Sequence, residues 1–265
     1  MKVMERLGLI GKPSDWLIAS VVNRELLSER MHIQLVDIPI ESIIELGEVD
    51  SGLAGADAIY KRVRELVDEY KLAGVTLRCF DLLSSVKNTG CIALSRLNDE
   101  GIPAACEGDV PTLLTMMLCK RLSGCPGFQV NPARIEKSET NGKVKLLLAH
   151  CTIPTKMCTS FSLTTHYESG IGVAIHGELP IGDYTLVKLS GNLDRIFAED
   201  VELVANQYES NLCRTQVWIE GNNGIRDYLL TKPIANHHVL LPGHYASELK
   251  HLFETQIFPD EKIEN

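Results

Sequence analysis

A change of pattern near residue 125 most constrains what this chain can fold into. Before that point, short apolar stretches at 6–11, 74–83 and 102–109 are predicted to be strands, and they alternate with segments predicted to be helical, one of which begins at about Asp15. Residues 56–72 show this periodicity clearly, because Ile59, Val63, Leu66 and Tyr70 recur at three- and four-residue spacing. Strands separated by helices of this length predict a parallel, two-sided α/β layer.

After Gly124 the sequence consists of short apolar and β-branched runs separated by Gly, Asn, Pro and Asp. This spacing predicts an antiparallel sandwich or barrel. Residues 235–258 are predicted to return to helix. We therefore expect an α/β domain over residues 1–124 and a β-rich, barrel-like domain with a C-terminal helix over residues 125–265.

Composition excludes several classes of function. The net charge of −9 and the absence of a Lys/Arg cluster disfavour nucleic acid as a partner. No apolar run reaches the roughly 20 residues of a spanning helix, so we expect no membrane partner. The N-terminus lacks the pattern of a signal peptide, and the eight cysteines form no C-x-x-C pair. These features predict a cytoplasmic protein.

Two carboxylates, Glu107 and Asp109, stand where a predicted strand passes into a helix. Asp109 suits the helix N-cap, because Pro111 follows in the first turn. Glu107 lies at the carboxyl end of a strand, where open α/β sheets bind ligands.

Asn131 and His237 join Glu107 as candidate site residues, since Asn131 follows a predicted strand and His237 precedes a predicted helix. Oxygen donors with one imidazole suit Mn²⁺ or Mg²⁺ better than structural zinc. Each residue also has a structural interpretation, as a surface carboxylate, a turn residue and a helix cap respectively. Two further histidines are weaker candidates. His166 lies in a polar stretch that also suits a hairpin turn, and His150 ends an apolar strand, where a packed histidine is expected over a ligand.

Several segments together resemble the L-fucose isomerase-like family, with L-arabinose isomerase as a more distant relative. The most specific are "NDEGIPAACEGDVP" and "ANHHVLLPGH", and the resemblance runs from about Arg6 to the last helix. It implies an α/β domain followed by a β-barrel domain, in agreement with the pattern above. Members of this family bind Mn²⁺ through a Glu, an Asp and a His, and interconvert an aldose and a ketose.

Carried over residue by residue, the resemblance places the Glu on Glu107 and the His on His237, with Asn236 as a substrate contact. The Asp position falls on Asn131. A neutral amide removes one negative charge and cannot act as a base, so metal affinity should fall. Glu107 is then the only matched carboxylate of the catalytic pair at positions 107 and 131. Mg²⁺ and Co²⁺ remain alternatives to Mn²⁺.

The resemblance also implies substrate contacts in the second half of the chain. Arg214 and Trp218 fall near the family's substrate, and His166 is a further candidate contact. Arg214 could pair a sulfonate or phosphate through its planar fork, or could be a charge on the barrel surface. Family members carry an additional N-terminal α/β domain and a site between subunits. We therefore expect a homo-oligomer, or a partner subunit that supplies that domain.

The predicted function is a metal-dependent aldose–ketose isomerase that acts on a small sugar through a cis-enediolate. One alternative is a non-catalytic sugar-binding or regulatory relative, which Asn131 favours. Another is a lyase or epimerase that acts on a sulfonated or acidic sugar.

Overall fold

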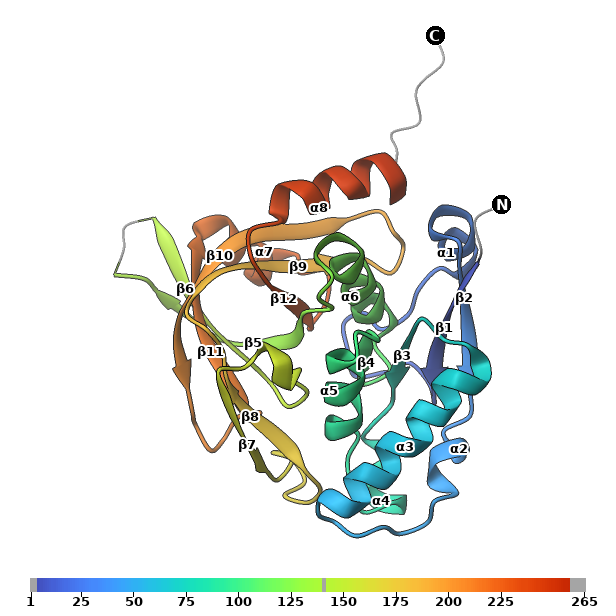
Figure 1. Ribbon diagram of the computed structural model, residues 1–265. Coiled ribbons are helices and arrows are strands. Elements are labelled where there is room, and N and C mark those ends of the chain that lie inside the picture. The colour runs from blue at the N-terminus through green and yellow to red at the C-terminus, as the bar shows by residue number, and fades with distance from the viewer. Residues whose placement is uncertain (1–3, 140–141, 258–265) are drawn as a thin grey trace.

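A four-stranded parallel sheet forms the first half of the protein in a computed structural model, which describes residues 4–139 and 142–257 (Figure 1). The strand order is β2-β1-β3-β4. The strands are β1 (Glu5–Ile10), β2 (Ile33–Ile38), β3 (Gly74–Leu77) and β4 (Ala104–Cys106). The helices are α1 (Arg24–Met31), α2 (Glu41–Ile44), α3 (Leu53–Tyr70), α4 (Asp81–Ser85), α5 (Cys91–Asp99) and α6 (Val110–Ser123).

This strand order places a topological switch between β1 and β3, because the chain proceeds from β1 to β2 on one side and resumes with β3 on the other. Open α/β sheets bind ligands outside the carboxyl ends of strands at such a point. The segments that leave this edge are residues 11–23 after β1, residues 78–80 after β3 and residues 107–109 after β4.

A closed antiparallel barrel forms the second half, with the strand order β10-β11-β6-β5-β12-β9. Its strands are β5 (Phe128–Lys137), β6 (Lys143–His150), β9 (Gly182–Leu189), β10 (Ile196–Gln207), β11 (Thr215–Asn222) and β12 (His238–Pro242). A separate hairpin contains β7 (Ser160–Thr164) and β8 (Ala174–Glu178). The remaining elements are a 3₁₀ turn (Thr155–Met157), α7 (Asn223–Thr231), α8 (Ala246–Leu252) and a π-helical turn (Phe253–Ile257).

Helix α6 lies between the sheet and the barrel (Figure 1). Every residue from Val110 to Cys119 is buried. One apolar cluster joins Leu7 of β1, Leu114 of α6 and Val239 of β12, so the two halves share a core through this helix. A helix that is apolar on all sides is expected to be buried on all sides.

The α/β prediction is confirmed for the first half, and the second half is a barrel and not a sandwich. Three local predictions were wrong. The helix expected from about Asp15 begins only at Arg24, after a loop. The strand expected to continue to Leu83 ends at Leu77, and a helix begins at Asp81.

The third error concerns residues 235–258, which were expected to be helical. His238–Pro242 form β12, because backbone pairing with β5 and β9 closes the barrel at this position. Helix α8 begins only at Ala246, and Phe258 lies outside the described residues. No helix in the described parts of the chain is long and apolar enough to cross a membrane.

Candidate metal centre

Glu107 leaves the edge of the parallel sheet on a sharp turn. Its φ is +63° and that of Gly108 is +62°, so two successive left-handed residues carry the chain from β4 into α6. A Cβ on residue 108 would lie 2.4 Å from the Lys12 carbonyl oxygen, which explains the glycine. A non-glycine residue with positive φ is strained, and such strain concentrates at functional sites. The turn projects Glu107 away from the helix that follows.

Two histidines from the barrel half converge on this carboxylate. His237 Nε2 lies 3.4 Å from Glu107 Oε1, and His150 Nε2 lies 3.8 Å from the same oxygen. The two imidazole rings are 5.3 Å apart and meet edge to face. The ligand atoms of all three residues lie within 4.8 Å of one another, so together they could hold a metal ion.

The other ring nitrogen of each histidine is already bonded. His237 Nδ1 lies 2.9 Å from Asp109 Oδ2, and His150 Nδ1 lies 3.0 Å from Thr152 Oγ1. Because an ionised carboxylate only accepts hydrogen bonds, His237 Nδ1 carries the proton. In neutral His237, Nε2 then presents a lone pair. That atom is buried and has no hydrogen-bond partner among the described residues. Metal-binding histidines have this arrangement, so the donor set fits a divalent cation.

Asp109 links the candidate centre to the start of α6. It accepts a hydrogen bond from Thr112 N at 2.8 Å, which confirms the predicted N-cap. Its carboxylate also lies 3.4 Å from the Nζ of Lys188, whose side chain is fully buried. Burial raises the pKa of Asp109, but Lys188 and His237 outweigh that effect and lower it to about 2. Asp109 therefore stays ionised and holds His237 in one orientation.

The pKa values of the two histidines are shifted in opposite directions at the centre. Burial disfavours the charge on Glu107, yet His150 and His237 together bring its pKa well below the usual range. Burial also lowers the pKa of His237, but the Asp109 and Glu107 carboxylates raise it to about 9. The pKa of His150 is lowered, chiefly by burial. In the absence of a cation, a proton on His237 balances the charge of Glu107.

Asn131 and Asn236 are near neighbours, along the backbone, of the two histidines: Asn236 precedes His237, and Asn131 pairs with Ala149, which precedes His150. Asn131 is on β5, two residues after Gln129, whose side-chain oxygen accepts a hydrogen bond from Cys106 N at 2.7 Å. Residues two apart on a strand share a face, so Asn131 is on the face that is turned toward the end of β4. Asn131 and Asn236 line a common hollow of about 300 Å³, and Asn236 Oδ1 accepts a hydrogen bond from Ile18 N.

His166 is connected to the centre through aromatic rings. Its ring meets the edge of Phe80 at 5.7 Å, Phe80 meets Trp16 at 5.5 Å, and Trp16 donates a hydrogen bond to Glu107. Its Nε2 lies 3.0 Å from Glu168. His166 therefore remains a candidate substrate contact.

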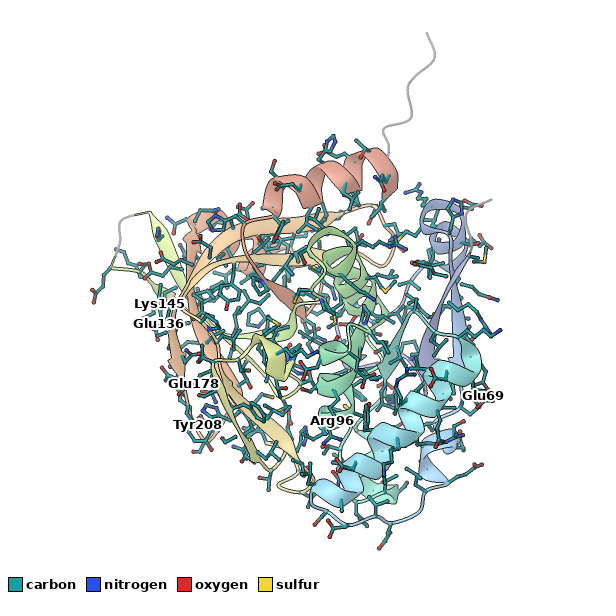
Figure 2. All side chains as sticks on the ribbon, viewed as in Figure 1. Glu69, Arg96, Glu136, Lys145, Glu178 and Tyr208 are labelled. Atoms are coloured by element: carbon teal, nitrogen blue, oxygen red, sulfur yellow. The ribbon has the colours of Figure 1, made fainter. Side chains whose placement is uncertain are left out.

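Arg214 and Trp218 have surroundings other than those expected from the sequence. Arg214 is buried and donates to the carbonyl oxygens of Thr165 and Ser210, so it is not an exposed barrel charge. Trp218 donates to Gln207, and its ring lies 4.9 Å from Lys145 Nζ. Figure 2 shows Lys145 on the side of the barrel away from the parallel sheet. These contacts place Trp218 among barrel side chains and not beside Glu107.

Two curated proteins match this chain in sequence. The sulfoquinovose isomerase of Clostridium sp. (strain MSTE9) is 27% identical over 125 residues, which cover 47% of this chain and 26% of that protein. The sulfoquinovose isomerase of Alkalicoccus urumqiensis is 27% identical over 159 residues, which cover 58% and 35% respectively. This chain is similar to sugar isomerases. It spans about a third or less of these relatives, and no protein-family model matches it.

The similarity supports the expected relationship to sugar isomerases, while the narrower resemblance to L-fucose isomerases stays a prediction. Two residues at the centre were not predicted from the sequence as part of it. His150 was expected to pack rather than to bind, although its position at the end of an apolar strand matches that of Glu107. Trp16 was not singled out, because it lies 91 residues from Glu107 and only the fold brings the two together.

Proposed function

We propose that this chain carries the metal centre of a sugar isomerase that interconverts an aldose and a ketose through a cis-enediolate. Glu107, His150 and His237 are the proposed ligands. The observation that carries the proposal is the buried Nε2 of His237, which faces Glu107 without a hydrogen-bond partner among the described residues. The similarity to two sulfoquinovose isomerases supports the class of reaction.

The proposed ligand set revises the expected trio of Glu107, Asn131 and His237. His150 replaces Asn131 as the third ligand. Asn131 is a neutral oxygen donor on the face of β5 that is turned toward the end of β4. Two imidazoles and one carboxylate suit first-row divalent metals such as Mn²⁺, Co²⁺ and Fe²⁺ better than Mg²⁺, which prefers oxygen ligands.

A bound divalent cation would supply positive charge where the enediolate develops negative charge on two adjacent sugar oxygens. Glu107 is ionised at neutral pH, and either this carboxylate or a water molecule at the centre would move the proton between C2 and C1. Asp109 orients His237, and the amides of Asn131 and Asn236 can bond sugar hydroxyls. Arg214 acts by holding the segment that carries His166, because its guanidinium bonds the Thr165 carbonyl. Trp218, which contacts Gln207 and Lys145, is not part of this proposal.

The test is the metal content and the aldose–ketose conversion of the wild type and of Glu107→Gln. The wild type should retain a divalent metal and convert a sugar from a panel that includes sulfoquinovose and neutral aldoses. Glu107→Gln should lose both properties. The matched control is Glu69→Gln, on the exposed side of α3 away from the barrel (Figure 2), which should keep both. Equal metal content in the wild type and Glu107→Gln would contradict the ligand assignment.

A second candidate function is sugar binding without catalysis, which is favoured by the neutral Asn131 at the expected carboxylate position. Sugar binding in calorimetry, together with no conversion in the presence of metal, would identify it. We also propose that the chain works as a homo-oligomer or with a partner subunit. The molecular mass in solution is therefore measured alongside both assays.

A further inference from the structure

The loop between β1 and α1 crosses the candidate centre and is attached on both sides of it. Ser14 donates a hydrogen bond from its hydroxyl to the Glu107 carbonyl, and the Ser20 carbonyl accepts one from Val110 N. Between these two points, Ile18 N donates to the side-chain oxygen of Asn236, the residue before His237. The loop therefore contacts the chain next to two of the proposed ligands.

Trp16 is the residue of this loop that reaches the Glu107 side chain. Its indole Nε1 donates to Glu107 Oε2 at 2.8 Å, while 49% of the residue remains exposed. The ring is held in place from two sides, because the Arg78 guanidinium lies 4.7 Å from its centroid and Phe80 meets it edge to face at 5.5 Å. Arg78 is itself fixed by a hydrogen bond to the Pro13 carbonyl at 2.9 Å.

The two oxygens of Glu107 consequently have different surroundings. Oε2 accepts the Trp16 hydrogen bond, whereas Oε1 is the oxygen that faces the Nε2 atoms of His150 and His237. Indole is a donor only, so it cannot compete for the cation. A hydrogen bond to an ionised carboxylate is among the stronger ones.

We propose that Trp16 is a positioning residue of the metal centre, which holds Glu107 Oε2 so that Oε1 alone is presented as a ligand. This inference rests on the proposed metal-binding function. A carboxylate that binds through one oxygen occupies one coordination position in place of two. The position left open would be available to a second sugar oxygen, as an enediolate requires.

The experiment compares two substitutions that divide the properties of the indole. Trp16→Phe keeps a ring against Arg78 and Phe80 but removes the donor. Trp16→Gln keeps an N–H donor but removes the ring. Loss of a partner that orients a ligand typically costs about 10- to 100-fold in metal affinity. Mn²⁺ affinity of the metal-free protein, measured by calorimetry, should fall by about that factor in Trp16→Phe and by clearly less in Trp16→Gln.

The matched control is Tyr60→Phe, which removes another aromatic donor from a carboxylate. Tyr60 bonds Glu100, which precedes β4, whereas Glu107 follows it at the opposite end of the strand. This variant should bind Mn²⁺ like the wild type, and thermal unfolding should show that all three variants are folded.

A second readout reports on the ligation itself. In infrared difference spectra recorded on Mn²⁺ addition, the gap between the two carboxylate stretching bands is wider for one-oxygen than for two-oxygen ligation. The wild type should show the wide gap, and the gap should narrow in Trp16→Phe.

The outcomes separate this inference from the proposed function. If the wild type binds Mn²⁺ and Trp16→Phe binds it equally well, the positioning role is overturned and the metal centre stands. If Trp16→Gln loses as much affinity as Trp16→Phe, packing of the ring and not the hydrogen bond is responsible, and the inference is again overturned. A wild type that binds no divalent metal would overturn both.

Discussion

At the scale of single residues, the proposed centre combines one carboxylate with two imidazoles. Glu107 contributes one negative charge, and the two imidazoles bind metal only when neutral. Asn131, on the face of β5 turned toward the end of β4, is an amide where the family resemblance places a carboxylate. A divalent cation held by Glu107, His150 and His237 would keep a net positive charge, which an anionic intermediate could balance.

Asn131→Asp is therefore expected to tighten Mn²⁺ binding by about tenfold, because replacing a neutral donor by a charged one is worth about 1–2 kcal/mol at a partly buried site. Calorimetry on the metal-free variant measures the change. Asn23→Asp is a suitable control, since the Asn23 side-chain oxygen caps α1 and aspartate caps helices equally well. Unchanged affinity in Asn131→Asp would mean that residue 131 points elsewhere.

Metal affinity should also depend on pH through His237. Its pKa is raised to about 9, with burial opposed by the Asp109 and Glu107 carboxylates. Below that pH a proton occupies the site that the cation needs, so binding must expel it. Mn²⁺ affinity should rise by about tenfold per pH unit between pH 6.5 and 8.5, and level off near pH 9. Dissociation constants at three pH values in this range provide the test, and equal values would contradict the assignment of His237 as a ligand.

The sequence predicted Glu107 and His237 but not the whole centre. Glu107 could be found because a carboxylate at a strand end has a defined place in an α/β sheet. His150 has the same kind of position, yet a histidine after an apolar run looks alike whether it packs or binds metal. The role of His150 depends on which strand of the barrel lies nearest to β4. The hydrophobic pattern of the sequence does not specify the order of the barrel strands.

At the scale of secondary structure elements, the turn from β4 into α6 determines where Glu107 points. The turn needs positive φ at residues 107 and 108, and the loop after β1 packs directly against it. The sequence predicted the strand, the cap and the helix here, because each has a local signal. No local signal in the sequence shows that residues 12–20 pack against this turn. The helix expected from about Asp15 was wrong for that reason.

Gly108→Ala should destabilise the protein through two separable effects. One is the cost of positive φ for alanine, about 1 kcal/mol, and the other is the clash with the Lys12 carbonyl, which lies 2.4 Å from the added carbon. Gly101→Ala is the control for φ alone, because Gly101 has φ of +78° and no atom within 4 Å of a Cβ. In urea unfolding, the free energy of unfolding should fall by at least about 1 kcal/mol more in Gly108→Ala than in Gly101→Ala. Equal decreases in the two variants would show that the loop containing Lys12 can move away from the added carbon.

At the scale of the whole molecule, the order of α/β half and barrel half could be predicted because periodicity of 2 or 3.6 residues is local information. Closure of the barrel could not, since it requires β12 to pair with both β5 and β9. The division into domains at residues 124 and 125 stays a prediction. The apolar cluster around α6 argues that the two halves, although different in architecture, depend on each other for stability.

Cooperative unfolding of the two halves can be tested with the two tryptophans of the chain. Trp16 belongs to the α/β half and Trp218 to the barrel, so Trp218→Phe and Trp16→Phe each leave one fluorescent reporter. In the background of either variant, Leu114→Ala removes a fully buried side chain from the shared cluster on α6 and should cost about 2–5 kcal/mol. If the halves form one cooperative unit, urea curves from both reporters should shift to lower urea by the same free energy. A shift seen by one reporter alone would mean that α6 stabilises only that half, and the metal centre between them would then depend on docking of two independent domains.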